Sequence, residues 1–171
     1  MDTAATVLLY AALAGFVIWR VVGRQLRGFT LTVRGLTLVP MILIALGVFS
    51  SAQSLPKASV TEIVLVGVDL VLLGALGALR ASTVAVGERN GYAFAKGSNA
   101  TLILWLVTVG IRIGFLVLGT QLHAVSEFTS ASIALSMGLT LAIQNAITYN
   151  KARQLGLRVA NNRAELATAQ V

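Results

Sequence analysis

Residues 60–79 read VTEIVLVGVDLVLLGALGAL, an almost unbroken apolar run that ends directly before Arg80. A helix rises about 1.5 Å per residue, so a run of about 20 residues crosses the roughly 30 Å of hydrocarbon in a bilayer. Four further runs of similar character lie outward from this one, at residues 3–22, 36–53, 99–120 and 131–149. The sequence therefore predicts five membrane-spanning helices.

The composition agrees with this prediction. Hydrophobic residues make up 57% of the chain and charged residues 11%, whereas soluble domains have roughly 45–50% and about 25%. A water-soluble chain of 171 residues has no interior large enough for so much apolar surface. We expect an all-α integral membrane protein, because lipid offers no partner to open backbone groups. Residues 1–150 would form the five-helix transmembrane bundle, and residues 151–171 a basic cytoplasmic tail.

Lysine and arginine are concentrated in alternate loops between the apolar runs. Four lie at the end of the first run or between it and the second, three between the third and fourth, and four after the fifth: Arg20, Arg24, Arg27, Arg34, Arg80, Arg89, Lys96, Lys151, Arg153, Arg158 and Arg163. The loops on the opposite side hold only Lys57. Basic loops are retained in the cytoplasm. We therefore expect a multi-pass protein of the bacterial plasma (inner) membrane, with its N-terminus outside and its C-terminus in the cytoplasm.

The segment between the third and fourth runs has the pattern of a small cytoplasmic β-hairpin. Residues 81–86 and 92–96 are rich in alternating and β-branched positions, and the Asn90-Gly91 pair between them favours a tight turn. Residues 30–34 also have strand character. The presence of strand character in both segments has two explanations. The chain contains a duplicated helix–strand–helix unit, or these strands simply pair with each other beneath the bundle.

Cofactor chemistry has few candidate ligands. The chain contains no cysteine and one histidine, His123, which excludes disulfides and thiol relays and argues against a zinc or iron site. The basic isoelectric point of about 10.9 is explained by topology and by attraction to anionic lipid. We expect no cofactor and no nucleic acid. The expected partners are membrane lipid and either another membrane protein or further copies of this chain.

Polar residues inside the predicted spans are the candidate site. Asp69 and Arg112 lie near mid-depth, where a charge costs roughly 2.5–3.5 kcal/mol or more, so we expect them to pair across neighbouring antiparallel helices. Glu62, Thr108 and Gln144 extend this polar seam at helical spacing. The seam either holds helices together through hydrogen bonds or lines a hydrated path or a small polar binding site. We favour the first interpretation, because five short spans leave little room for a cavity.

Glycines on two spans predict close helix packing. Gly110 and Gly114 form a G-x-x-x-G motif on the fourth span, almost opposite Arg112, and Gly67 and Gly74 lie on the third. Small residues let helix backbones approach. We expect these glycines to pack within the bundle, and a dimerisation face is the alternative.

Several short motifs occur in a fixed order over most of residues 15–153. They are Arg27-Gly28, Val33-Arg34, Leu38-Val39-Pro40, Gly77-x-x-Arg80, Thr83-Val84, Lys96-Gly97, Thr101-Leu102-x-Leu104-Trp105, Arg112 and Leu139-Thr140-Leu141-Ala142-x-Gln144. In these motifs the chain resembles the CcdC-like family of small bacterial multi-spanning membrane proteins. The resemblance implies the same topology and, by the family's name, a neighbourhood with cytochrome c maturation. The family has no established activity, and this chain lacks a cysteine for thiol chemistry.

The sequence predicts a non-enzymatic membrane protein. Its acid–base groups are few and do not form a convergent catalytic set. An accessory or assembly factor is the first interpretation. A small transporter or channel-like oligomer, built on the polar seam around Asp69 and Arg112, is the alternative. The substrate, the partner and the oligomeric state are not determined by the sequence.

Overall fold

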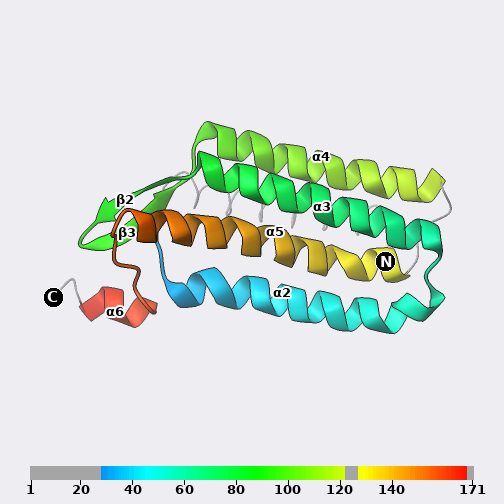
Figure 1. Ribbon diagram of the computed structural model, residues 1–171, viewed down its shortest axis with the longest axis horizontal. Coiled ribbons are helices and arrows are strands. Elements are labelled where there is room, and N and C mark those ends of the chain that lie inside the picture. Colours follow the sequence, from blue (N-terminus) through cyan, green and yellow to red (C-terminus); the bar gives the residue numbers. More distant parts are fainter. Residues whose placement is uncertain (1–27, 122–126, 169–171) are drawn as a thin grey trace, which may run out of the picture.

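The computed structural model describes residues 28–121 and 127–168. Within these residues four long helices lie side by side, with a small sheet at one end (Figure 1). The helices are α2 (Val33–Ser54), the short 3-10 helix η1 (Leu55–Lys57), α3 (Val60–Thr83), α4 (Asn99–Gln121), α5 (Glu127–Gln154) and the short α6 (Arg163–Thr168). Four of the five predicted apolar runs are thus helical. The first run, at residues 3–22, lies outside the described residues.

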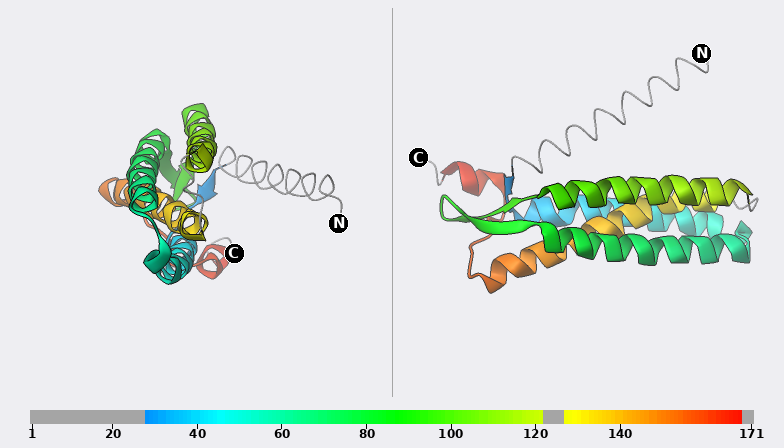
Figure 2. Two further views of the ribbon diagram at one scale, coloured as in Figure 1. Left: turned by 90° about the vertical axis from the view of Figure 1, so that its right-hand side faces the viewer. Right: turned by 90° about the horizontal axis from the view of Figure 1, so that it is seen from above.

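Helix α5 is the centre of the packing. It contacts α2 on one side and α3 on the other, and α4 packs on α3; Figure 2 shows this arrangement from the end and from above. The closest approaches are made by glycines. A Cβ built on Gly47 of α2 would lie 2.3 Å from the backbone of Leu135, and one on Gly138 of α5 would lie 2.7 Å from the backbone of Ile44. These two glycines bring the α2 and α5 backbones into contact.

Helix α2 contains Pro40 in its interior. Proline has no N–H, so the carbonyl of Leu36, four residues earlier, loses its helical donor. The side-chain amide of Asn145 on α5 donates to this carbonyl instead, at 2.7 Å. The helix therefore passes through Pro40 without leaving that backbone acceptor unpaired.

Helix α3 has defined ends. Ser59 and Glu62 form a capping box at its start, with the Ser59 N–H donating to the Glu62 carboxylate at 2.8 Å. At its other end, Lys151 of α5 donates to the carbonyls of Ala81 and Ser82 at 2.7 and 3.0 Å. The helix runs to Thr83, so the predicted strand character of residues 81–83 is wrong.

The sheet has three strands in the order β1–β3–β2, all antiparallel. They are β1 (Phe29–Thr30), β2 (Ala85–Arg89) and β3 (Tyr92–Lys96). The predicted hairpin is confirmed, and its turn places Asn90 and Gly91 at φ of 54° and 76°. Pairing of the earlier strand segment with the hairpin is also found, although Val33 and Arg34 already belong to α2.

A compact apolar core lies between the sheet and the end of α5. It includes the fully buried Leu31, Ala93, Ala95 and Ala152. The segment after α5 also packs against this end of the molecule. Ala160 is fully buried, and its carbonyl accepts a hydrogen bond from the Val33 N–H at 2.9 Å. The start of the segment expected to be a basic cytoplasmic tail, residues 151–154, belongs to α5. The tail is held against the sheet by backbone hydrogen bonds.

Two helices in the described part of the chain are long and apolar enough to cross a membrane, α2 with η1 (Val33–Lys57) and α3. Only 17% and 39% of their most apolar windows are buried. Their outer faces carry large exposed hydrophobic side chains such as Met41, Phe49 and Val71. The core helix of a soluble protein would bury these positions.

Candidate functional site

Asp69 of α3 and Arg112 of α4 form a salt bridge, as the sequence predicts. The Arg112 Nη1 lies 3.2 Å from the Asp69 Oδ2, and their side chains are 23% and 6% exposed. The two helices run antiparallel on either side of the β-hairpin, which brings these mid-helix positions level (Figure 1). Each charge is therefore neutralised within the bundle.

The pair is joined to α5 through serine. Arg112 Nη2 donates to the Ser136 hydroxyl, which in turn donates to the Ser132 carbonyl at 2.9 Å. Ser136 belongs to a column of buried polar side chains that recurs every fourth residue along α5: Ser132, Ser136, Thr140, Gln144 and Thr148. Spacing of four keeps them on one helix face. The column runs along the interior of the bundle.

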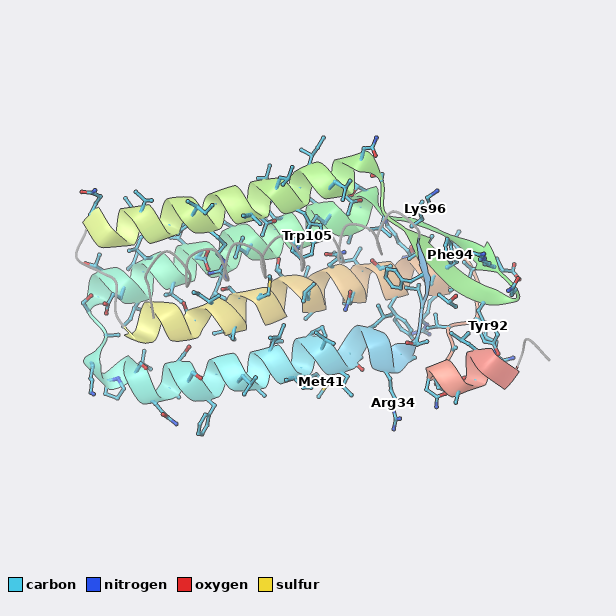
Figure 3. The ribbon with its side chains drawn as sticks, turned by 180° about the vertical axis from the view of Figure 1, so that it is seen from behind. Arg34, Met41, Tyr92, Phe94, Lys96 and Trp105 are labelled. Carbon is cyan, nitrogen blue, oxygen red and sulfur yellow. The ribbon has the colours of Figure 1, made fainter. Side chains whose placement is uncertain are left out.

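Arg80 is the centre of a second polar cluster, nearer the sheet. Its side chain is fully buried, and its guanidinium stacks on the Trp105 ring of α4, 4.1 Å from the ring centroid. Nη2 donates to the Thr140 hydroxyl at 3.2 Å. Nε and Nη1 have no hydrogen-bond partner among the described residues. Figure 3 shows Trp105 among the helices, whereas Arg34 points away from the bundle.

A cavity of about 380 Å³ adjoins this cluster. It lies between α2 and α4, and residues of α5 also line it. One part of its wall is polar, formed by Trp105, Gln144, Asn145 and Thr148, and the rest is mainly apolar, including Leu36, Val39, Leu43, Met137 and Leu141. The Trp105 Nε1 and the Gln144 Oε1 are buried without a hydrogen-bond partner among the described residues. The cavity is therefore amphipathic, with unused hydrogen-bonding groups on one side.

The remaining predicted seam residues have local partners. Thr108 is buried, and its hydroxyl donates to the Leu104 carbonyl one turn earlier, at 2.8 Å. Glu62 is buried as well, but its carboxylate is part of the α3 cap. Asp69, Arg112, Thr108 and Gln144 thus lie along the bundle interior, whereas Glu62 serves the start of its own helix.

The predicted glycine contacts are found in part. Gly74 faces α5, where an added Cβ would lie 3.2 Å from Ile143 Cδ1. Gly67, Gly110 and Gly114 have no described neighbour within 4 Å of such a Cβ. The expectation that Gly110 and Gly114 pack within the bundle is therefore wrong for the part of it that the structure describes. The close backbone contacts come instead from Gly47 of α2 and Gly77 of α3, which meet α5, and from Gly138 of α5, which meets α2.

No group of three or more His, Cys, Asp or Glu side chains within residues 28–121 and 127–168 is arranged to hold a metal ion. His123 lies outside the described residues. The polar groups that remain are donors and acceptors suited to hydrogen bonding with an anion or an amide. No family model, curated protein or solved structure matches the chain. The candidate site is therefore argued from its own residues.

Proposed function

We propose that this chain is a multi-pass protein of the bacterial inner membrane that acts without catalysis, as an accessory or assembly factor. The observation that carries the membrane assignment is the distribution of polarity. Large apolar side chains are exposed along α2, α3 and α4, while buried positions include Asp69, Arg80, Thr101, Thr108 and Thr140. A soluble bundle has the opposite distribution.

The proposed topology has five spans, with residues 3–22 as the first. In this arrangement the sheet end, with Arg34, Arg89 and Lys96, faces the cytoplasm, as basic loops do. The resemblance to the CcdC-like family supports the same topology. A location near cytochrome c maturation is the biological setting that this resemblance suggests.

Cysteine labelling tests the topology cleanly, because the chain has no native cysteine. Ser54 ends α2 at the end of the bundle away from the sheet, and Ser98 precedes α4 at the sheet end. In intact cells, Ser54→Cys should react with a membrane-impermeant thiol reagent and Ser98→Cys should not. Both should react after the membrane is opened. Equal labelling in intact cells would overturn the proposed orientation.

The accessory role is supported by the outer face of α4. Gly110 and Gly114 are exposed, with open space around them in the described part of the chain. A G-x-x-x-G face lets another membrane helix approach closely. Gly110→Leu with Gly114→Leu should dissociate a complex that survives mild detergent, measured as molar mass by light scattering. Gly67→Leu, at another open glycine on α3, is the matched control.

A transporter is the second candidate, and the polar column along α5 is the observation that favours it. Against it, the hydroxyls of Ser136, Thr140 and Thr148 already donate to backbone carbonyls. The Thr140 bond joins α5 to the Leu73 carbonyl of α3, and the other two lie within α5, so none of the three hydroxyls needs water as an acceptor. Proton or ion flux into liposomes that contain only this protein, abolished by Asp69→Asn, would establish transport in place of the accessory role.

A further inference from the structure

Arg80 carries a buried positive charge without a counter-charge among residues 28–121 and 127–168. Its guanidinium has one hydrogen bond, to Thr140, and one stacked ring, Trp105. Arginine stays protonated in proteins, and a buried charge is costly unless it is paired. The two ion pairs found among the described residues are those of Asp69 with Arg112 and of Glu165 with Arg158. Neither involves Arg80.

Among the carboxylates that the structure describes, none contacts Arg80. The chain has six acidic residues in all. Asp69 and Glu165 are paired, Glu62 caps α3, and Glu88 lies in the exposed strand β2. Glu127 begins α5 at the opposite end of the bundle, and Asp2 precedes an apolar run whose basic residues, Arg20, Arg24 and Arg27, all follow it. No described carboxylate therefore supplies the counter-charge, and a bound anion would.

The neighbouring cavity has polar groups that could bind an anion as the counter-charge. Trp105 lines the cavity, and the Arg80 guanidinium lies 4.1 Å from the centroid of its ring, so the positive charge is close to whatever occupies the space. Gln144 is 8% exposed and lines the cavity with an unpartnered side-chain oxygen. The unpartnered Trp105 N–H is a donor suited to an anionic oxygen. A tryptophan N–H and a glutamine amide together fit a phosphate ester with a neighbouring hydroxyl or amine.

The rest of the cavity fits an acyl chain. Leu36, Val39, Leu43, Met137 and Leu141 form a continuous apolar wall on α2 and α5. Arg80 lies three residues before the end of α3 at Thr83, which is about 5 Å at helical rise. This is the depth at which lipid headgroups meet the hydrocarbon. Polar groups at the sheet end and apolar groups deeper in the bundle match the polarity of a phospholipid.

We propose that the cavity between α2 and α4 binds the headgroup and one acyl chain of an anionic phospholipid, with Trp105 and Gln144 in its polar wall and the positive charge of Arg80 beside Trp105. The proposal rests on the membrane location proposed above. A second possible occupant is the chain's own apolar run at residues 3–22. That run carries no carboxylate, so it would fill the space and leave Arg80 without a counter-charge.

Native mass spectrometry of the full chain, purified in mild detergent, tests the proposal. The probes are phosphatidylglycerol, phosphatidylcholine with the same acyl chains, and inorganic phosphate. We expect one phosphatidylglycerol to be retained per chain, with little phosphatidylcholine. Arg80→Gln should weaken this binding about tenfold, because the positive charge near the cavity is lost, and Arg80→Lys should restore most of it. Arg89→Gln is the matched control, because Arg89 also lies over a ring, that of Phe94, but is exposed.

A second variant separates binding from folding. Leu43→Trp fills the apolar wall from α2 without touching Arg80, and it should displace the lipid while the thermal midpoint stays near that of the parent. Equal retention of both lipids, or retention unchanged by Arg80→Gln and Leu43→Trp, would place the lipid on the outer surface and overturn the proposal. Phosphate binding as strong as lipid binding would overturn the acyl-chain part. Absence of bound lipid from a protein that still fractionates with membranes would leave the membrane assignment standing and reject this site.

Discussion

Asn145 of α5 replaces the hydrogen bond that Pro40 removes from α2. Its side-chain amide donates to the Leu36 carbonyl at 2.7 Å, the acceptor that the missing proline N–H would have served. A proline inside an apolar helix is tolerated where a neighbouring helix supplies such a partner. The bond therefore fixes α5 against α2 at the point where α2 has lost a bond of its own.

The first prediction follows from this compensation. Asn145→Ala should lower the free energy of unfolding by about 1–3 kcal/mol, because it leaves a buried carbonyl unpaired. Pro40→Ala restores the backbone donor, so Asn145→Ala should cost much less in the Pro40→Ala background. The measurement is thermal or denaturant unfolding in detergent, as a double-mutant cycle. Strictly additive changes would show that the two residues act independently.

The sequence predicts some of these contacts and not others, for physical reasons. The contact between Asp69 and Arg112 is predictable from the sequence, because two opposite charges near the middle of the predicted spans have few other partners. The Asn145 contact could not, because an amide bonds to many groups and the acceptor lies 109 residues away. Arg80 was counted among the cytoplasmic loop charges, because the predicted helix ends at residue 79. The extra turn of α3 to Thr83 places it inside the bundle, and no local pattern signals that turn.

Removing one member of the Asp69–Arg112 pair should be more harmful than removing both. Asp69→Asn and Arg112→Gln each leave a single charge in the bundle, a loss of up to about 3–5 kcal/mol for a buried pair. The double variant should recover part of that loss in the thermal midpoint measured in detergent. Simple addition of the two losses would show that the 3.2 Å contact does not contribute to stability. Arg89→Gln on exposed β2 is the control for loss of a positive charge.

Glycines on α3 should differ sharply in their tolerance of a methyl group. A Cβ on Gly77 would lie 2.6 Å from the Thr140 carbonyl oxygen, whereas one on Gly67 would meet nothing within 4 Å. Gly77→Ala should therefore force α3 and α5 apart and lower stability by about 1–3 kcal/mol, as overpacking does. Gly67→Ala should be neutral or stabilising by up to about 1 kcal/mol, because alanine favours helix. Unfolding midpoints of the two variants in the same detergent compare them directly, and equal midpoints would contradict the close α3–α5 contact.

The hairpin turn should reject β-branched residues. Asn90 and Gly91 have positive φ, a region that costs about 1–2 kcal/mol for an ordinary residue. Replacing both by valine should loosen the turn and increase protease cleavage between β2 and β3, while the protein still inserts into the membrane. Gly87→Val is the matched control, since Gly87 has open space around it and no positive φ. Unchanged cleavage in the double variant would mean that the turn has another conformation in solution.

The tail should detach from the sheet in acid. The Asn161 N–H donates to Glu165 Oε2 at 2.8 Å and Arg158 donates to Oε1 at 2.9 Å. These contacts hold the pKa of the Glu165 carboxyl below its ordinary value, and the hydrogen bond from the Asn161 N–H has the largest effect. A carboxyl with a lowered pKa in the folded state adds stability above the ordinary glutamate pKa of about 4.3. That stability is lost as the pH falls through the lower, folded value.

Hydrogen exchange of the Val33 and Ala93 amides measures this detachment, because both donate to tail carbonyls, those of Ala160 and Arg158. After correction for intrinsic exchange rates, protection should be constant from about pH 7 to 5 and should fall below about pH 4. Glu165→Gln should reduce protection at neutral pH and remove the acid-dependent step. Glu88→Gln alters an exposed carboxylate of β2 at the same end of the molecule and should leave the step in place. Acid-independent protection in the parent would show that backbone bonds alone hold the tail to the sheet.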